Sequence, residues 1–440
     1  MGFIADKQTL GDLNLLDRYG SSSIFALFDQ TRTKGGQVLL EKMFRHPLTD
    51  VASISRRSSL FKYFQGLDLV FPVNVEELTI MERSLHSIQQ RNWLSSIGQT
   101  VRRQSLRLLG LHEEYDLFIQ GLQITSSIMS RLNIFLNDLL KKDPGSPFED
   151  SIRHFQALYN DPRIEKVHSV RQNARISFGR QVKCSHLLGN VFYQRMFDVL
   201  NMLYELDVYI SVSTVARLHR FSYANALPAE EQVLHIKNCR YPVLKNAQGN
   251  DIRLDSDGNI LFLTGANMAG KSTLMKSIGV AVYLAHMGFP IAADRMKFSI
   301  RDGIFSSINL PDDISQGYSH FYAEVLRVKT VAEAVGSSKK LLVIFDELFK
   351  GTNVKDAFDA TLSVTKAFAA YRNCAFIIST HILEVADELG KDHPNIIFSQ
   401  MPTVMDGRTP TYTYILQDGV SADRHGMMII ENEGILDMLV

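Results

Sequence analysis

The hydrophobic residues in the first half of the chain recur at intervals of three and four. This spacing places them on one face of a helix and predicts a mostly helical region up to about residue 230. Pro47 and the turn sequence 143–147 interrupt the pattern, because proline cannot continue a helix. The expected helices cover residues 22–28, 36–44, 54–64, 75–87, 93–109, 111–140 and 187–218.

Two of these helices, 111–140 and 187–218, are much longer than the others. A helix of about 30 residues spans roughly 45 Å, which is more than a compact bundle of this size needs. Such helices can act as levers that connect one end of a molecule to the other. A plain antiparallel helical bundle is the alternative interpretation.

From residue 231 onward the pattern changes to strands that alternate with helices, which is typical of a mainly parallel sheet with crossover helices. We therefore expect a helical domain over residues 1–228, a hinge at 226–231 and an α/β domain over 229–440. A last helix is expected from about Gly426. The expected strands cover residues 260–263, 303–308, 340–347, 374–379 and 411–416.

The composition limits the class of protein. The chain holds 47 basic and 47 acidic residues, and this balance argues against a general polyanion binder but permits a local basic face. Cys184, Cys239 and Cys374 are far apart, which indicates a reducing compartment and neither a disulfide framework nor a zinc site. Because neither a signal peptide nor a membrane-spanning run is recognisable, we expect a cytoplasmic protein.

The segment 163–183 is the most basic stretch, with six cations and a single acid, Glu165. It could contact nucleic-acid phosphates, and residues 1–230 carry 27 basic against 23 acidic residues, the sign expected for such a role. A solvated charged surface is the simpler interpretation, since Phe178 is the only aromatic residue among the cations. The cations are Arg163, Lys166, Arg171, Arg175, Arg180 and Lys183.

The clearest candidate for chemistry is the stretch 261–273, LFLTGANMAGKST. Its glycines and lysine follow the pattern G-x-x-x-x-G-K-[ST], between a predicted strand and a predicted helix. Backbone N–H groups of such a loop can bind a triphosphate, Lys271 can neutralise the outer phosphates, and the Ser272 hydroxyl can bind Mg²⁺. A tight glycine turn with a solvated lysine is the alternative.

Two further strand ends carry polar side chains. Residues 340–347 read KLLVIFDE, which places Asp346 and Glu347 at the carboxyl end of a buried strand. Asp346 could hold Mg²⁺, and Glu347 could orient or deprotonate the attacking water. His381 follows the next expected strand and could reach a γ-phosphate. An ordinary acidic turn and a structural histidine are the alternatives.

These motifs resemble those of the MutS family of mismatch-repair ATPases. TGANMAGKST resembles the family's TGPNMGGKST, with Ala266 in place of proline and Ala269 in place of glycine. FDELFKGTN resembles DEIGRGTS, with Phe349-Lys350 where Gly-Arg is usual. The other matching stretches in this half are RYPV at 240–243, GYSHFYAEV at 317–325, STH at 379–381 and YILQDGVSADRHGMMI at 414–429.

The first half carries the resemblance as well. ALFDQTRTKGGQVLLEKMFRHPLTD, at residues 26–50, resembles the family's core-domain stretch, and ELDV at 205–208 resembles part of the returning lever helix. The matching stretches follow one another in the family's order over nearly the whole chain. The resemblance implies an all-α core and lever domain followed by an α/β P-loop NTPase domain of the ABC type.

The resemblance also implies roles for individual residues. Asp346 and Ser272 would bind Mg²⁺, while Glu347, His381 and Lys271 would support hydrolysis. Two ATPase domains would face each other in a homodimer, and Ser319 would reach the nucleotide of the other subunit. The residues expected to bind ATP are Gly265, Ala266, Asn267, Met268, Ala269, Gly270, Lys271, Ser272, Thr273 and Ser319.

The sequence also departs from the family. Its only Phe-x-Glu, at 345–347, is already assigned to Mg²⁺, so the wedge that stacks on a mispaired base has no counterpart. The segment 141–186 is short for a DNA-gripping clamp, and nothing after residue 440 resembles the family's C-terminal dimerisation helices. We expect an ATP-dependent protein that binds double-stranded DNA, mismatched or structured. The alternative is a MutS-derived ATPase that acts on branched DNA or a protein partner without recognising mismatches.

Overall fold

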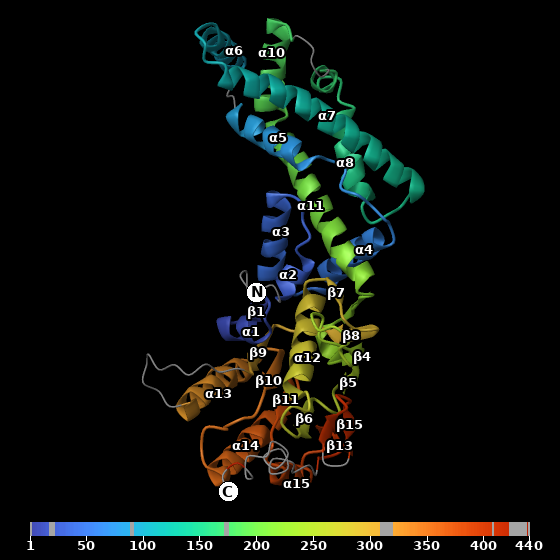
Figure 1. Ribbon diagram of the computed structural model, residues 1–440, viewed down its shortest axis with the longest axis vertical. Helices are drawn as coiled ribbons and strands as arrows, with labels where there is room; N and C mark the ends of the chain where they lie inside the picture. The colour runs from blue at the N-terminus through green and yellow to red at the C-terminus, as the bar shows by residue number, and fades with distance from the viewer. Residues whose placement is uncertain are drawn as a thin grey trace. The chain divides into compact units, whose positions relative to one another are not determined.

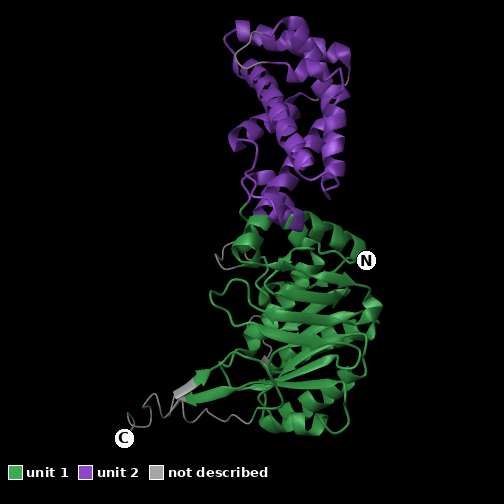
Figure 2. Cartoon of the chain, turned by 90° about the vertical axis from the view of Figure 1, so that its right-hand side faces the viewer, with its two compact units in different colours: residues 1–30, 41–61, 212–440 green, residues 31–40, 62–211 purple. Residues whose placement is uncertain are grey.

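The computed structural model describes residues 2–16, 23–88, 92–170, 176–308, 320–406 and 409–421, and residue 438. The chain forms two compact units (Figure 2). Unit 1 comprises residues 1–30, 41–61 and 212–440, and unit 2 comprises residues 31–40 and 62–211. The two units are interleaved along the sequence, so their boundaries differ from the expected division into 1–228 and 229–440. That division stays a proposal.

Unit 2 is helical. Its longest helix, α7, has 30 residues and buries an apolar face that includes Phe118, Leu122 and Leu132. The expected helix 187–218 begins with a π-helical turn, η1, before α11. The helices wholly within unit 2 are α5 (Val75–Ser87), α6 (Trp93–Leu108), α7 (Glu113–Lys142), α8 (Glu149–Tyr159), α9 (Glu165–His168), α10 (Phe178–His186) and η1 (Leu187–Val191).

Three helices continue from one unit into the other: α3 (Lys34–Arg45), α4 (Val51–Gln65) and α11 (Tyr193–Leu218). Within unit 2, a buried carboxylate fixes the start of α3. Asp207 of α11 accepts hydrogen bonds from the backbone N–H of Arg32, at 3.0 Å, and of Thr33, at 2.8 Å. A Cβ at Gly36 would lie 2.5 Å from Asp207 Oδ2, so only glycine fits there.

Unit 1 is built on a seven-stranded sheet in the order β1-β9-β10-β11-β6-β12-β15 (Figure 1). The pairs are parallel except for β12 with β15. The central strands are continuous apolar runs because they are buried on both faces. The strands are β1 (Ile4–Ala5), β6 (Ile260–Gly265), β9 (Gly303–Ser307), β10 (Leu341–Phe345), β11 (Ala375–Ser379), β12 (Ile396–Met401) and β15 (Gln417–Asp418).

Smaller sheets and flanking helices complete unit 1. Their bounds are β2 (Ser222–Tyr223), β3 (Asn225–Leu227), β4 (Leu234–Cys239), β5 (Asn250–Leu254), β7 (Pro290–Ile291), β8 (Arg295–Ser299), β13 (Thr403–Asp406), β14 (Thr409–Tyr412), α1 (Lys7–Asp12), α2 (Ile24–Phe28), α12 (Lys271–His286), α13 (His320–Gly336), α14 (Val354–Ala369) and α15 (Glu384–Leu389). Strand order in the four-stranded sheet is β3-β8-β4-β5, and β2 pairs with β7 and β13 with β14.

The expected hinge, the expected strand at 411–416 and the expected last helix each have a different outcome. The hinge expected at 226–231 includes part of β3, which pairs with β8, followed by a 3₁₀ turn at Ala229–Glu231. The strand expected at 411–416 is wrong in its bounds, since β14 ends at Tyr412 and Tyr414 has a φ of 56°. The helix expected from Gly426 lies outside the described residues.

The first residues of the chain, which were expected to belong to the helical domain, belong to unit 1 and include the strand β1. Ile4 pairs with Gly303, so β1 extends the edge of the sheet. Asp12 at the end of α1 accepts hydrogen bonds from the Ser306 hydroxyl, at 2.7 Å, and the Ile308 N–H, at 2.9 Å. In the described part of the chain, no helix is long and apolar enough to cross a membrane.

Candidate functional site

The loop between β6 and α12 is shaped by backbone conformations that favour glycine. Gly265 has a φ of 144°, and a Cβ there would lie 2.8 Å from the carbonyl oxygen of Met401. Gly270 has a φ of 103°, and a Cβ there would lie 3.0 Å from the Tyr414 ring. These positions let the chain turn sharply from a buried strand into a helix. Residues 265–270 thus form a tight loop at the carboxyl edge of the sheet.

The start of α12 lies open to a cavity. Gly270 is the N-cap residue and offers no side chain to the first N–H groups of the helix. Ser272 and Thr273, both exposed, line the cavity. A helix start with unsatisfied N–H groups carries partial positive charge and favours an anion.

Lys271 is buried beneath the loop, with 5% of its surface exposed. Its Nζ donates to the carbonyl oxygens of Gly265, at 2.9 Å, and Ala266, at 3.1 Å. Burial lowers the pKa of Lys271 from its usual value, while the charges of Glu347 and Asp346 oppose this shift. The loop therefore holds the ammonium group against its own carbonyls, where a phosphate could compete for it.

The neighbouring strands β10 and β11 bring their carboxyl ends together beside this loop. The Ser379 hydroxyl donates to Asp346 Oδ1 at 2.6 Å and accepts from the Glu347 N–H at 3.0 Å. Oε1 of Glu347 lies 3.9 Å from Lys271 Nζ and 3.8 Å from His381 Nδ1. Sequence reasoning had placed the carboxylates and His381 at this edge, but it missed the bridging Ser379.

The charge on Glu347 is favoured by its neighbours. The His381 ring lowers the pKa of the Glu347 carboxyl below its usual value, and Lys271 acts in the same direction while burial opposes both. Glu347 is therefore an ionised carboxylate at neutral pH. An ionised carboxylate at the edge of a cavity can accept a proton from water.

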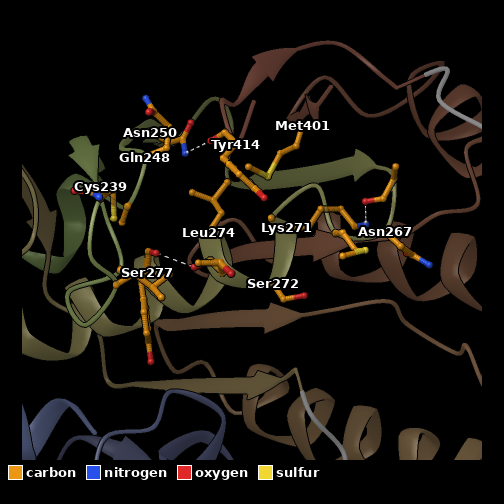
Figure 3. A pocket seen from close by; sticks show the side chains of 18 of the residues that line it. Cys239, Gln248, Asn250, Asn267, Lys271, Ser272, Leu274, Ser277, Met401 and Tyr414 are labelled. Carbon is orange, nitrogen blue, oxygen red and sulfur yellow. Dashed lines mark hydrogen bonds between the residues drawn. The ribbon is translucent and has the colours of Figure 1, made fainter. Parts of the chain in front are cut away.

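The cavity measures about 710 Å³ and extends from the loop toward β4 and β5 (Figure 3). Tyr414 and Met401 form part of its wall. The amide of Asn250 holds this wall, because it donates to the Tyr414 carbonyl at 3.0 Å and accepts from the Leu416 N–H at 2.6 Å. No sequence signal pointed to Asn250. The cavity offers an apolar and aromatic end beside a cationic end.

The helix α13 contacts the loop that follows Glu347. Glu324, which is 5% exposed, accepts from the Gly351 N–H at 3.4 Å. The Phe321 and Phe349 rings lie 6.1 Å apart. Ser319, the residue expected to reach a second subunit, lies outside the described residues.

Comparison with known proteins identifies the family. Two family models match the chain, described as MutS domain III over residues 8–213 and MutS domain V over residues 261–440. The chain belongs to the MutS family. Domain V is the ATPase domain of this family, and the loop at 265–270 lies within it. MutS family members are ATPases that bind DNA and function as dimers.

Individual relatives agree with this assignment. The DNA mismatch repair protein MutS of Fusobacterium nucleatum is 27% identical over 519 residues, which cover 97% of this chain and 57% of that protein. The protein of the same name from Thermotoga maritima is 27% identical over 526 residues, covering 99% and 64%. That of Clostridioides difficile is 32% identical over 200 residues, covering 44% and 21%. The chain spans less than two thirds of the length of these MutS relatives.

The basic segment of the MutS domain III region is only partly available for an external partner. Arg163 pairs with Asp161 at 2.7 Å, and Arg163 lowers the pKa of that carboxyl to about 2. Arg180 donates to the Ser169 hydroxyl at 2.7 Å. Lys166 and Lys183 are exposed, and Arg171 and Arg175 lie outside the described residues.

Proposed function

We propose that this chain binds ATP with Mg²⁺ in the 710 Å³ cavity and hydrolyses it. The observation that carries the proposal is the convergence at the loop: a buried lysine, an uncapped helix start and an ionised carboxylate within 3.9 Å of the lysine. This combination suits a phosphate chain and its hydrolysis. We also assign the P-loop NTPase fold of the ABC type to unit 1, because β6, the loop and α12 follow that arrangement.

The residues present fit a nucleotide-bound magnesium ion. In the described residues, no three His, Cys, Asp or Glu side chains are grouped to hold a metal. Mg²⁺ commonly takes only one or two protein ligands and completes its shell with phosphates and water. The Ser272 hydroxyl and the Asp346 carboxylate would hold it. When bound, the ion would neutralise charge on the phosphate oxygens.

The other side chains would then act on nucleotide and water. The loop N–H groups from Gly265 to Thr273, together with Asn267, would bind the phosphates, and Lys271 would exchange its carbonyl partners for them. Glu347 would accept a proton from the attacking water, and His381 would orient Glu347 or contact the γ-phosphate. Tyr414 offers its ring to the base. We further propose that Ser319 completes the site of a second copy in a homodimer.

The direct test of nucleotide binding is the variant Lys271→Ala. The phosphates would lose the only lysine of the loop, so binding of a fluorescent ATP analogue with Mg²⁺ should become undetectable. Lys329→Ala, an exposed lysine on α13, is the matched control and should bind as the wild type does. An unchanged dissociation constant in Lys271→Ala would reject the site.

For the wider role, we propose a MutS-like, ATP-dependent protein that binds double-stranded DNA in mismatch repair. The relatives' name, DNA mismatch repair protein MutS, supports this role. The alternative is a MutS-derived ATPase acting on branched DNA or a protein partner without mismatch recognition. Gel-shift titrations with paired, mismatched and branched DNA, with and without ATP, separate the two. Strong preference for one mismatch would reject the alternative.

A further inference from the structure

The four-stranded sheet of unit 1 carries a positively charged face, apart from the ATP cavity. Side chains alternate along its strands, so that Ile236, Ile252 and Met296 are buried while their neighbours point to solvent. A shallow groove of about 440 Å³ lies on this face. Figure 1 shows the three strands β4, β5 and β8 beside one another. The basic residues that line the groove are His235, Lys237, Arg253, Arg295 and Lys297.

Strand register gathers four of these basic residues into a block. His235 lies directly opposite Lys297, and Lys237 lies directly opposite Arg295. Along each strand the two cations are two residues apart, which corresponds to about 7 Å. We call His235, Lys237, Arg295 and Lys297 the cation block.

Three of the four side chains of the block have no bonded counter-charge. Lys237, Arg295 and Lys297 have no side-chain hydrogen bond or ion pair with any residue that the structure describes. Nε2 of His235 is buried without a hydrogen-bond partner, and its nearest carboxylate oxygen, in Asp255, is 3.7 Å away.

Three acids lie close to the block, and one of them, Asp251, lines the same groove. Asp255 pairs with Arg253 at 3.1 Å, and Asp294 accepts from the Asn238 amide at 3.0 Å. Asp251 accepts from the Asn238 N–H at 2.9 Å. Like charges directly opposite each other destabilise a pair of strands. A block of this kind is favourable when an external anion covers it.

We propose that the cation block binds the phosphate backbone of double-stranded nucleic acid. The proposal rests on the DNA-binding part of the proposed function and adds a contact surface on unit 1. Successive phosphates repeat along a strand at a spacing comparable to that of the two cations on β4 or β8. Lysine and arginine contacts to phosphates position a protein on a duplex without reading its sequence.

The surroundings of the block favour a duplex over other anionic partners. Among the described residues, none of the exposed large apolar side chains lies on β4, β5 or β8, whereas protein interfaces use such side chains as anchors. Among the described residues that line the groove there is no Phe, Tyr or Trp, which are the side chains on which the bases of a single strand commonly stack.

The test is a triple variant, Lys237→Gln, Arg295→Gln and Lys297→Gln, in the full chain. Binding of a labelled 30-base-pair duplex is measured by fluorescence anisotropy across a range of salt concentrations, without nucleotide. Affinity at low salt should fall at least tenfold, and the slope of log K against log salt should flatten by about 0.9 for each phosphate that the variant no longer neutralises. Basal ATP hydrolysis should not change, since none of the three residues lines the ATP cavity.

The matched control removes the same charge from helices of the same unit, by Lys329→Gln, Lys355→Gln and Lys366→Gln, and should bind like the wild type. In the wild type, the duplex should also protect Lys237 and Lys297 from acetylation, but not Lys329. Equal loss of affinity in both triple variants, or no protection of Lys237 and Lys297, would overturn the proposal.

Three other results would also reject the proposal. Protection of the block by pyrophosphate but not by duplex would make it a site for small anions. A wild-type chain that binds no duplex would reject the proposed DNA-binding function as well, whereas binding that persists unchanged in the triple variant would reject the cation block alone.

Discussion

The Phe349 backbone lies in the left-handed region, with a φ of 61°, and its ring lies 6.1 Å from that of Phe321. The MutS stretch DEIGRGTS, which FDELFKGTN resembles, has glycine at the position of Phe349. Glycine adopts this conformation freely, whereas a side chain with a Cβ is strained by about 1–2 kcal/mol. The buried ring offsets that strain, since Phe349 is only 4% exposed.

Restoring glycine at this position should therefore destabilise the protein. Phe349→Gly relieves the backbone strain but removes a buried ring, a loss of about 3–5 kcal/mol when phenylalanine is truncated. The free energy of unfolding should fall by about 2 kcal/mol in urea titrations. Phe349→Leu keeps part of the packing and all of the strain. A Phe349→Gly variant more stable than the wild type would mean that strain outweighs packing.

Asn250 should hold the cavity wall formed by Tyr414 in place, although its side chain would not bind the phosphates itself. Asn250→Ala leaves the Tyr414 carbonyl and the Leu416 N–H without this partner, at a cost of about 1 kcal/mol for each hydrogen bond. A loosened wall should raise the dissociation constant for ATP about tenfold, equivalent to about 1.4 kcal/mol. Isothermal titration measures this constant, while turnover at saturating ATP should be kept. Unchanged affinity would show that the wall does not contact nucleotide.

Stability should depend on pH through His286 at the end of α12. This buried ring contacts the Leu48 carbonyl through Nδ1, at 2.9 Å, and accepts from the Arg301 N–H at 3.2 Å. Burial lowers the pKa of His286 to about 4. Its unfolded pKa is about 6.5, so the unfolded chain takes up the proton first as pH falls.

The stabilisation from neutral His286 is complete above about pH 6.5 and should be lost between about pH 6.5 and 4, by about 3 kcal/mol in total. Urea titrations across this range measure the slope. His286→Gln should flatten it, and His219→Gln, at an exposed histidine, should leave it unchanged. Equal slopes in the wild type and His286→Gln would contradict the assignment.

Ser319 should make hydrolysis depend on a second copy of the chain. If its hydroxyl completes the site of the other subunit, the rate per subunit should rise with protein concentration, and ATP should promote dimers. Light scattering and steady-state hydrolysis measure the two effects. A monomer with a rate that is independent of concentration would contradict this arrangement.

The sequence predicts the elements whose cause is local. The strands at Ile260–Gly265, Leu341–Phe345 and Ala375–Ser379 are continuous apolar runs because both of their faces are buried. The helix at Val75–Ser87 follows its expected bounds, since its apolar spacing is regular and Asn74 caps its start.

Elements that depend on distant contacts were not predictable. The two-residue strand at Ile4–Ala5 is too short to show a period and exists because it pairs with β9. The alternation in TYTYIL predicts a strand over 411–416, yet β14 stops at Tyr412. Asn250, 164 residues away, bonds Tyr414 and favours a different backbone conformation.

The residues of the candidate site also fall into two groups, those that the local sequence indicates and those that depend on distant contacts. Lys271, Asp346 and Glu347 are candidates from the sequence alone, because the phosphate-loop motif and the end of an apolar strand single them out. Ser379 and Asn250 act through hydrogen bonds to other residues, and nothing in their local sequence signals those bonds.

The central claim is that Glu347 removes a proton from water during ATP hydrolysis. The most direct measurement compares Glu347→Gln with the wild type in two assays, ATP binding at equilibrium and phosphate release in a single turnover. Glu333→Gln, at an exposed glutamate on α13, is the control. The account predicts that Glu347→Gln binds ATP and that its phosphate release falls by about 100-fold or more, because an amide cannot act as a base. Phosphate release at the wild-type rate in Glu347→Gln would contradict it.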